Sequence, residues 1–223
     1  MNSGDLVENG MQRIADESRS GARSGALYGV VIGLVTNNKD EENLGRVKVK
    51  FPWLSEEDES QWARVATPMA GKDRGALFLP EVDDEVLIAF EHGDMRRPYV
   101  LGALWNGVDT LPKEFGNDGK NNLRLIKSRS GHLIKLDDTD GGEKIELIDK
   151  SGKNSIVVDT KENTITITTD KDILLKAPKG KISLDAKEIE LKSSAAVKVE
   201  AGSEMTLKAS ATATLKGATV NIN

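Results

Sequence analysis

The sequence contains no cysteine and only two histidines among its 223 residues. The first absence excludes disulfide bonds, thiolate metal sites and cysteine nucleophiles, and the second leaves too few imidazoles for most histidine-built metal centres. Long apolar runs are also missing, since the longest, residues 27–35, is interrupted by glycines and is far too short to span a bilayer. The N-terminus lacks the basic and then apolar pattern of a signal peptide, so we expect synthesis in the cytoplasm.

Basic charge is not in excess, because 31 lysines and arginines are outnumbered by 36 aspartates and glutamates, which gives a net charge of −5. No global positive field therefore attracts nucleic acid. Aromatic side chains are missing from the second half: all nine lie between Tyr28 and Phe115, and residues 116–223 have none. The first half thus holds the large side chains that fill an ordinary core, and the second half must bury itself in another way.

Residues 27–107 show the pattern of a small β-barrel. Residues 27–36 are rich in valine and isoleucine, and Val47, Val49 and Phe51 alternate with lysines as in a half-buried strand. Further candidate strands are residues 61–67, the alternation of Val86, Ile88 and Phe90 after the Asp83-Asp84 turn, and residues 99–104 after Pro98. Five short strands without a helix-length pattern predict an all-β fold that begins with a five-stranded barrel of the OB type.

The remainder of the chain divides into four regions. Residues 1–26 form an N-terminal extension, whose weak apolar set (Leu6, Met11 and Ile14) is compatible with a short helix or a frayed end. Residues 108–122 contain helix- and strand-breaking proline and glycine and are predicted to be a linker. Residues 123–163 are predicted to form a transitional β-sheet stalk, and residues 164–223 a β-helix spike.

An octad repeat runs through the last region. Pairs of apolar residues at positions i and i+2 recur with a mean spacing just under eight residues, which is typical of a solenoid. The pairs are Ile165/Ile167, Ile173/Leu175, Ile182/Leu184, Ile189/Leu191, Val197/Val199, Met205/Leu207, Ala213/Leu215 and Val220/Ile222. The earlier pairs Ile145/Leu147 and Ile156/Val158 alternate at wider spacing, which assigns them to the transitional sheet.

Each octad directs only two aliphatic side chains inward. Their burial is too small to offset the conformational entropy that is lost when the residues of the octad become ordered, about 1–2 kcal/mol for each residue. Three octads could make one coil of a single-chain β-helix, but the segment would form only about two and a half coils, below the roughly three repeats that a solenoid needs. Three chains that each supply one face would give every layer an apolar core and would pair the sheet edges. We therefore favour an intertwined homotrimer over the single-chain coil, with the eight pairs, Ala213 excepted, as its core.

The sequence stops one residue after the inward-facing Ile222, which would leave an apolar triangle at the tip of a trimer. Solenoid ends usually carry a polar cap. We therefore expect a separate capping protein on Val220, Asn221, Ile222 and Asn223.

Several segments resemble the VgrG and phage gpV family of baseplate central spikes. Residues 45–53, with the sequence GRVKVKFPW, are similar to the family's GRVKVxFPW segment. The other similar segments are residues 62–66, 75–82, 84–94, 97–107 and 128–132. The resemblance covers residues 27–137 in motif detail and continues to residue 223 as the octad pattern.

The resemblance implies a homotrimeric spike of a contractile injection system, whether a phage tail, a type VI secretion system or an extracellular phage-tail-like particle. In this family the OB barrel lies near the hub, sheath contraction drives the β-helix through the target envelope, and a PAAR-repeat protein caps many members. Larger members carry a hub domain before the barrel, where this sequence has about 25 residues, so we expect a separate hub protein. The linker leaves no space for the lysozyme domain of some phage relatives, and the His-x-His metal apex of some short spikes is absent. Effector cargo is compatible with the family.

The residues that bear acid–base or metal chemistry lack the partners that a site needs. His92 has no accompanying serine or cysteine nucleophile motif, and His132 is predicted to lie in a hairpin turn. The acidic run at residues 137–143 fails the EF-hand ligand pattern and is predicted to be a turn. We therefore predict no catalytic, cofactor-binding or metal site, no cofactor and no enzyme activity.

Two other functions stay open as alternatives. Arg46, Lys48 and Lys50 with Trp53 or Trp62 could form a stacking groove for nucleic acid on an OB barrel, although the neighbouring loop at residues 55–60 is strongly acidic. A carbohydrate-binding, tailspike-like β-helix would need paired carboxylates and stacking aromatics, and the second half has no aromatic residue. The sequence favours a protein-docking barrel and a structural spike, with contact to the target membrane only in transit.

Overall fold

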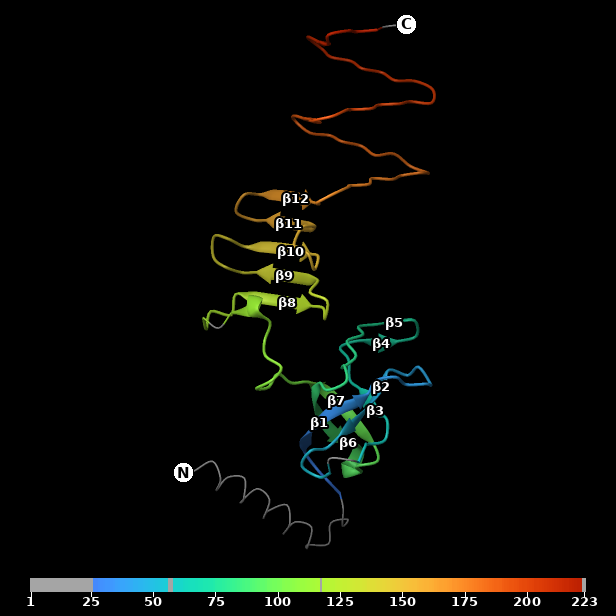
Figure 1. Ribbon diagram of the computed structural model, residues 1–223, viewed down its shortest axis with the longest axis vertical. Coiled ribbons are helices and arrows are strands. Elements are labelled where there is room, and N and C mark those ends of the chain that lie inside the picture. The colour runs from blue at the N-terminus through green and yellow to red at the C-terminus, as the bar shows by residue number, and fades with distance from the viewer. Residues whose placement is uncertain (1–25, 56–57, 117, 222–223) are drawn as a thin grey trace. The chain divides into compact units, whose positions relative to one another are not determined.

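The structure is a computed structural model that describes residues 26–55, 58–116 and 118–221. Residues 1–25, which include the predicted extension with Leu6, Met11 and Ile14, lie outside the described residues, as do Ile222 and Asn223. The chain divides into two compact units after Asp170. In its described residues the first unit is built from strands (Figure 1), with two short 3₁₀ turns at Glu91–Gly93 and Lys113–Phe115, which confirms the predicted all-β class.

The first part of this unit is a closed five-stranded barrel, as predicted. Its strands are β1 (Val30–Asn37), β2 (Arg46–Lys50), β3 (Ala63–Val65), β6 (Glu85–Phe90) and β7 (Pro98–Ala103). They close in the order β1-β2-β3-β7-β6, and every neighbouring pair is antiparallel except β3 and β7, which are parallel. A single parallel pair in a closed, otherwise antiparallel five-stranded barrel identifies the OB type.

The barrel core is made of small aliphatic and aromatic side chains at alternate strand positions. The buried residues are Val35, Val47, Val49, Phe51, Ala63, Val86, Ile88, Phe90 and Val100. Gly33 lies on the inward side of β1, where an added Cβ would approach Ile88 Cγ1 and Val49 Cβ to 3.3 Å. The lumen is therefore filled by its side chains, and the predicted alternation accounts for six of these nine residues, but not for Val35, Ala63 and Val100.

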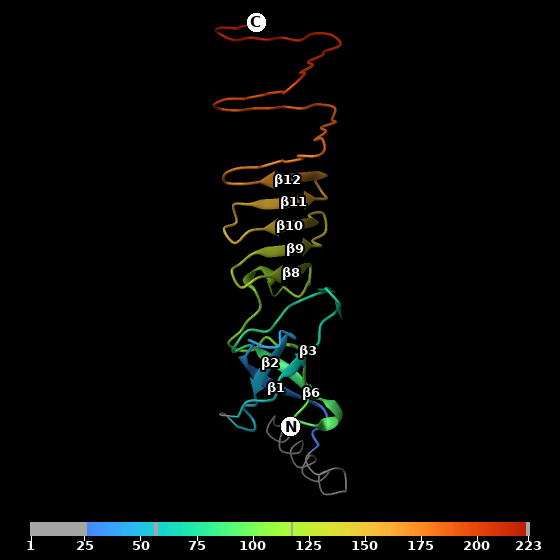
Figure 2. The ribbon, with the colours of Figure 1, turned by 90° about the vertical axis from the view of Figure 1, so that its right-hand side faces the viewer.

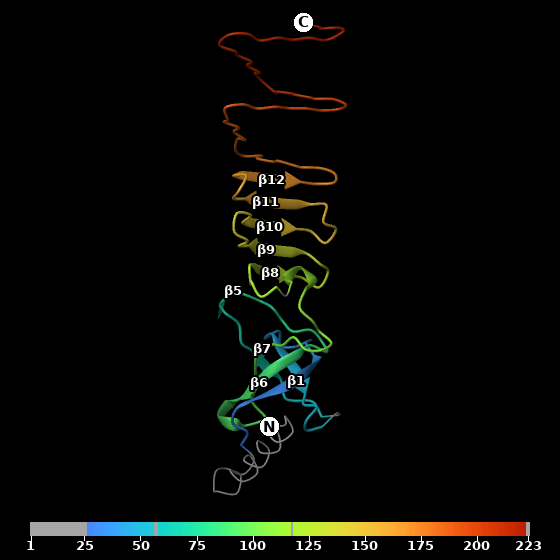
Figure 3. The ribbon, with the colours of Figure 1, turned by 90° about the vertical axis from the view of Figure 1, so that its left-hand side faces the viewer.

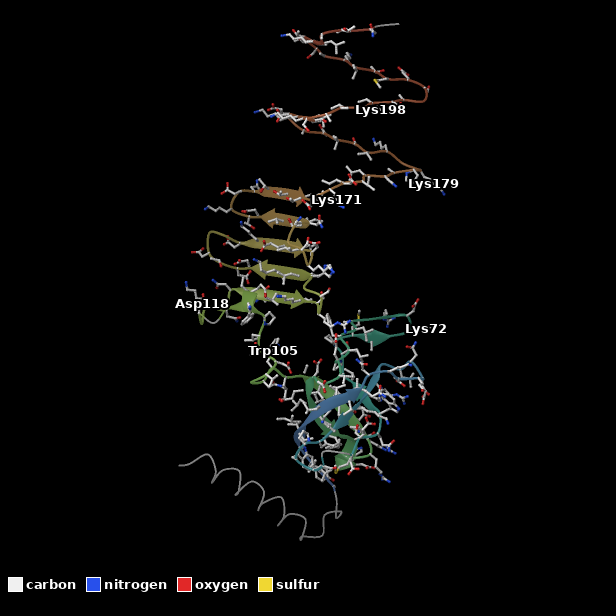
Figure 4. All side chains as sticks on the ribbon, viewed as in Figure 1. Lys72, Trp105, Asp118, Lys171, Lys179 and Lys198 are labelled. Atoms are coloured by element: carbon white, nitrogen blue, oxygen red, sulfur yellow. The ribbon has the colours of Figure 1, made fainter. Side chains whose placement is uncertain are left out.

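A short hairpin that the sequence pattern did not predict projects from the barrel between β3 and β6. It consists of β4 (Ala70–Gly71) and β5 (Arg74–Gly75), which pair only with each other among the strands of the described chain. Figure 4 shows Lys72 at its tip. We call residues 67–78 the arm, because they leave the barrel after Ala66 and return at Leu79, which packs against the core.

The second part of this unit is a five-stranded antiparallel meander. Its strands are β8 (Leu123–Lys127), β9 (Leu133–Asp137), β10 (Lys144–Ile148), β11 (Ser155–Asp159) and β12 (Thr164–Thr168), and each pairs with its sequence neighbours. Figure 2 shows the five strands stacked in chain order. The first predicted octad pair, Ile165 and Ile167, lies in β12, so the octad pattern begins within the meander.

Residues 171–221 form the described part of the second unit and contain no assigned strand. They run in extended stretches between bends, as Figure 3 shows, and Lys179 lies at one of these bends in Figure 4. The bends lie at residues 178–180, 187, 194–195, 202–203, 210–211 and 218–219. The backbone therefore changes direction about every eight residues, between the predicted aliphatic pairs.

Candidate assembly surfaces

One face of the β8–β12 meander is aliphatic and uncovered. The cross-strand registers place two columns of side chains on it, and the antiparallel partners in each column point to the same side of the sheet. The first column is Arg124, Leu136, Ile145, Val158 and Ile165, and the second is Ile126, Ile134, Leu147, Ile156 and Ile167. Eight of these nine aliphatic residues are exposed in the single chain, the exception being half-buried Val158. We call this surface the aliphatic face.

The opposite face of the same sheet carries charged pairs. Lys135 pairs with Glu146, and Lys144 Nζ lies 2.8 Å from Asp159 Oδ2, in both cases across neighbouring strands. The Asp159 carboxylate raises the pKa of Lys144, and Lys144 lowers the pKa of Asp159. These charged residues are half-buried, as are Leu125, Leu133, Ile148 and Val157 on the same face, so this face, which we call the polar side, is the less exposed one. An exposed aliphatic face of this kind is typical of an interaction surface.

The predicted core residues of the second unit are exposed along the whole described segment. Their exposed fractions run from 46% at Met205 and Val220 to 89% at Leu207. This group comprises Ile173, Leu175, Ile182, Leu184, Ile189, Leu191, Val197, Val199, Met205, Leu207, Leu215 and Val220. The single chain thus brings together the first predicted pair, Ile165 and Ile167, with the other aliphatic residues of the meander. It leaves the later pairs without a shared core.

The tip residues are described only in part. Val220 is 46% exposed and Asn221 is exposed, whereas Ile222 and Asn223 lie outside the described residues. A cap-facing role for these four residues therefore stays a prediction.

On the barrel, two of the three basic residues considered for nucleic acid, Arg46 and Lys48, are engaged with nearby side chains. The Arg46 guanidinium donates to both carboxylate oxygens of Asp40, at 2.8 and 2.7 Å, and Lys48 Nζ lies 3.1 Å from Glu59. Arg46 and Lys48 also lie over the Trp62 ring, 5.6 and 5.5 Å from its centroid. Carboxylates therefore neutralise these two cations, and the cations occupy the Trp62 ring, one of the two rings considered for stacking on a base, whereas Trp53 is 49% exposed.

Asp40 organises the loop between β1 and β2. Its carboxylate accepts hydrogen bonds from the backbone N–H groups of Glu42, Leu44 and Arg46 as well as from the Arg46 side chain. The Arg46 side chain is the main cause that holds the Asp40 pKa well below its usual range, and the backbone donors act in the same direction. The conformation of this loop thus depends on the negative charge of the Asp40 carboxylate.

We expect Asp40→Asn to lower the thermal midpoint of the barrel at pH 7. Because the folded pKa is depressed, the ionised carboxylate stabilises the fold fully above the ordinary aspartate pKa of about 3.9 and progressively less as the pH falls through that value. The gap between the wild-type and Asp40→Asn midpoints should therefore be constant from about pH 7 to 5 and narrow below about pH 4. Tryptophan fluorescence measures this, because all three tryptophans lie in residues 53–105.

Glu41→Gln is the matched control, because Glu41 is an exposed acid in the same loop. An unchanged gap down to pH 3, or an equal effect of the control, would contradict the role of the Asp40 charge.

The arm forms one side of a groove of about 1280 Å³ on the barrel. Its lining includes Trp62, Arg64 and Tyr99 from the barrel and Leu77 and Phe78 from the arm. Arg64 lies 5.6 Å from the centroid of the Tyr99 ring, on the neighbouring parallel strand. Sequence reasoning missed this groove, because strands of two residues leave no alternation that could have predicted the arm.

The two histidines and the acidic run that were considered for catalysis or metal binding lie in or beside turns. His92 follows β6 in the 3₁₀ turn with a left-handed backbone (φ 51°), and His132 Nδ1 accepts a hydrogen bond from the backbone N–H of Lys150 at 3.2 Å. The acidic run folds as the turn between β9 and β10, closed by a 2.8 Å hydrogen bond from the Gly142 N–H to the Thr139 carbonyl.

In residues 26–55, 58–116 and 118–221, no group of three or more acidic or histidine side chains is placed to hold a metal ion. Nor does this part of the chain contain a helix of the length and apolarity that crossing a membrane requires.

The described chain thus consists of a closed OB barrel, a meander with an uncovered aliphatic face and an extended octad segment. Residues 31–105 match the family of type VI secretion system and phage-baseplate injector OB domains. This match and the similarity to curated spike proteins support the VgrG and gpV family of type VI secretion and phage-baseplate spike proteins.

Curated relatives agree with this assignment. The chain is 29% identical over 143 residues to the type VI secretion system spike protein VgrG1a of Pseudomonas aeruginosa, a match that covers 60% of this chain and 22% of the relative. It is 31% identical over 131 residues to VgrG1b of the same organism, with 54% and 18% covered, and 32% identical over 130 residues to VgrG3 of Vibrio cholerae, with 53% and 13% covered. The chain thus matches about a fifth or less of the length of these relatives.

Proposed function

We propose that this protein is a non-enzymatic structural spike of a contractile injection system, and that it works as a homotrimer. The observation that carries the proposal is the aliphatic face, which presents nine aliphatic side chains in two unbroken columns to solvent in the single chain. At about 25 cal/mol for each Å² of apolar surface, covering such a face is a large driving force for association. The similarity of residues 31–105 to the injector OB domain and of the chain to type VI secretion spike proteins supports the same conclusion.

Unpaired backbone also supports further copies of this chain as the partner. β12 is the edge strand of the meander, its sequence Thr-Ile-Thr-Ile-Thr is β-branched throughout, and it carries none of the charges, prolines or bulges that protect free edges. Residues 171–221 are extended but have no strand partner among the residues that the structure describes. Two further copies of the chain would supply both the missing strand partners and the missing cover for the aliphatic side chains.

The function of the trimer would then depend on the stiffness of the rod and not on a chemical reaction. A trimeric rod with paired edges has no free lateral strand and would separate only when all three chains unfold together. Driven by sheath contraction, such a rod would pierce the target envelope. Its outer surface would be the polar side of the meander, where Lys135–Glu146 and Lys144–Asp159 neutralise one another and limit lateral adhesion.

The partners in this proposal follow from the family resemblance. A hub protein would bind at the barrel end, and a PAAR-repeat protein would cap the end that contains Val220 and Asn221, with effector cargo as a further passenger. The protein would be assembled into the baseplate of the particle and delivered into or through the target envelope.

Light scattering on the purified chain tests the proposal. We expect a mass of about 73 kDa, three times the 24.2 kDa of one chain, and a trimer band on an SDS gel of an unboiled sample. A 24.2 kDa species in solution would overturn the trimer and return the octads to a single-chain solenoid.

A further inference from the structure

The outer surface of the barrel has an apolar side that the barrel itself does not use. Val30 and Ile32 point outward from β1 and pair with Ala89 and Leu87 of β6. Leu101 is exposed on β7, the next strand around the barrel. Val30, Ile32 and Leu101 are about half exposed, at 54%, 46% and 47%. We call these five residues the wall.

The other outward side of the barrel is charged. Arg46 and Lys48 point outward from β2, and Arg64 points outward from β3. Arg46 and Lys48 are paired with acids, as described above, and Arg64 lies over Tyr99. The wall is therefore a distinct apolar patch of the barrel surface and not part of a uniformly apolar domain. It has the composition of a surface that is covered in the assembly.

The arm is the second uncovered apolar surface of the same domain. Leu77 is 80% exposed, Phe78 is 66% exposed and Met69 is 51% exposed, all at the base of a hairpin that projects from the barrel. The charged residues of the arm, Lys72, Asp73 and Arg74, are confined to its tip. A projecting apolar element and a flat apolar sheet face thus occur together on one small domain.

A ring of identical subunits needs two such surfaces. In a cyclic trimer each contact is heterologous, so that one patch of a subunit meets a different patch of the next subunit. A hub protein would need only one apolar patch on each barrel, whereas a ring of barrels uses both. A stalk that holds three barrels together would also raise their effective concentration, so that even a small contact would form.

We propose that in the spike trimer the arm of each barrel packs Leu77 and Phe78 against the wall of the next barrel. This inference rests on the proposed trimeric spike, and it assigns an occupant to both apolar surfaces of the barrel. The three barrels then form a closed ring in which no arm and no wall is left uncovered.

Cysteine cross-linking tests the contact directly, because the natural chain has no cysteine. In the full-length double variant Ile32→Cys/Phe78→Cys, a flexible bismaleimide linker is expected to join each chain to its neighbour and to give a covalent trimer on a boiled SDS gel. The matched control is Lys39→Cys/Phe78→Cys, in which the first cysteine lies at an exposed position in the loop after β1. This control should stay at the mass of one chain.

Maleimide labelling of single-cysteine variants provides a second readout. In the trimer, Ile32→Cys and Phe78→Cys are each expected to react roughly tenfold more slowly than Lys39→Cys, because a neighbour covers them and only local opening exposes them. A trimer by light scattering that gives no covalent trimer, or whose two cysteines react as fast as the control, overturns the arm-and-wall contact and leaves the proposed spike intact. A single-chain mass in light scattering overturns the proposed trimer itself.

Discussion

Ile167→Asp is expected to abolish the trimer, whereas Thr166→Asp, one residue earlier in the same strand, is expected to leave it intact. Both side chains are exposed in the single chain, Ile167 at 57%, but they lie on opposite faces of β12. In the trimer Ile167 is part of the aliphatic face, so the substitution would bury three like charges in one layer. Each unpaired buried charge costs several kcal/mol, which is comparable to the stability of a whole domain.

Light scattering and the unboiled SDS gel distinguish these outcomes. Loss of the trimer in Ile167→Asp with a stable trimer in Thr166→Asp would establish that the aliphatic face is the buried one. Equal tolerance of both substitutions is what an isolated sheet would show, and it would contradict the proposed assembly. Tryptophan fluorescence provides the folding control, because all three tryptophans precede residue 106 and report on the barrel alone.

Leu175→Asp and Leu174→Asp are expected to differ as sharply within the octad segment. These neighbouring leucines have almost the same exposure in the single chain, 69% and 74%. The octad pattern places Leu175 in the core and Leu174 on the outer surface, because successive side chains of an extended chain point to opposite sides. We expect Leu175→Asp to loosen the rod around its layer, and Leu174→Asp to be tolerated.

Hydrogen exchange is the measurement for this pair. In the wild type and in Leu174→Asp, amides between residues 171 and 221 should exchange slowly, because strands of partner chains satisfy them. In Leu175→Asp, amides near the substitution should exchange at the rate of open chain. Rapid exchange throughout this segment in the wild type would show that the octads do not form strands in the assembly.

Alternation was the signal that predicted the barrel. Val47 and Val49 in β2 and Val86 and Ile88 in β6 are buried, as their period of two indicated. The first strand begins at Val30 rather than at residue 27, because Gly29 adopts a left-handed backbone (φ 113°) just before it. The order of the strands, with β3 parallel to β7, depends on contacts between distant segments and could not be predicted from local pattern.

The candidate surfaces, like the barrel, could be predicted only in part from the sequence. The octad period is visible in the sequence, and the bends between residues 178 and 219 recur with the same spacing, whereas the inward direction of the aliphatic pairs stays a prediction. The wall was missed, although the run at residues 27–35 differs from β2 in having no alternation, which is typical of a strand with apolar side chains on both sides. The arm left no signal, because its strands are two residues long and contain glycine.

The meander and the octad segment differ in the source of their hydrogen bonds, and this difference dictates an order of folding. Each strand from β8 to β12 pairs with its neighbour in sequence, so the loops that must close are short and the sheet requires no second chain. Residues 171–221 have no strand partner among the described residues, so in the proposed trimer they would pair only after the chains associate. In that trimer the meander would form first, at a rate independent of protein concentration. The pairing of residues 171–221 would then be second or third order in chains, so dilution should delay it while leaving the formation of the meander unchanged.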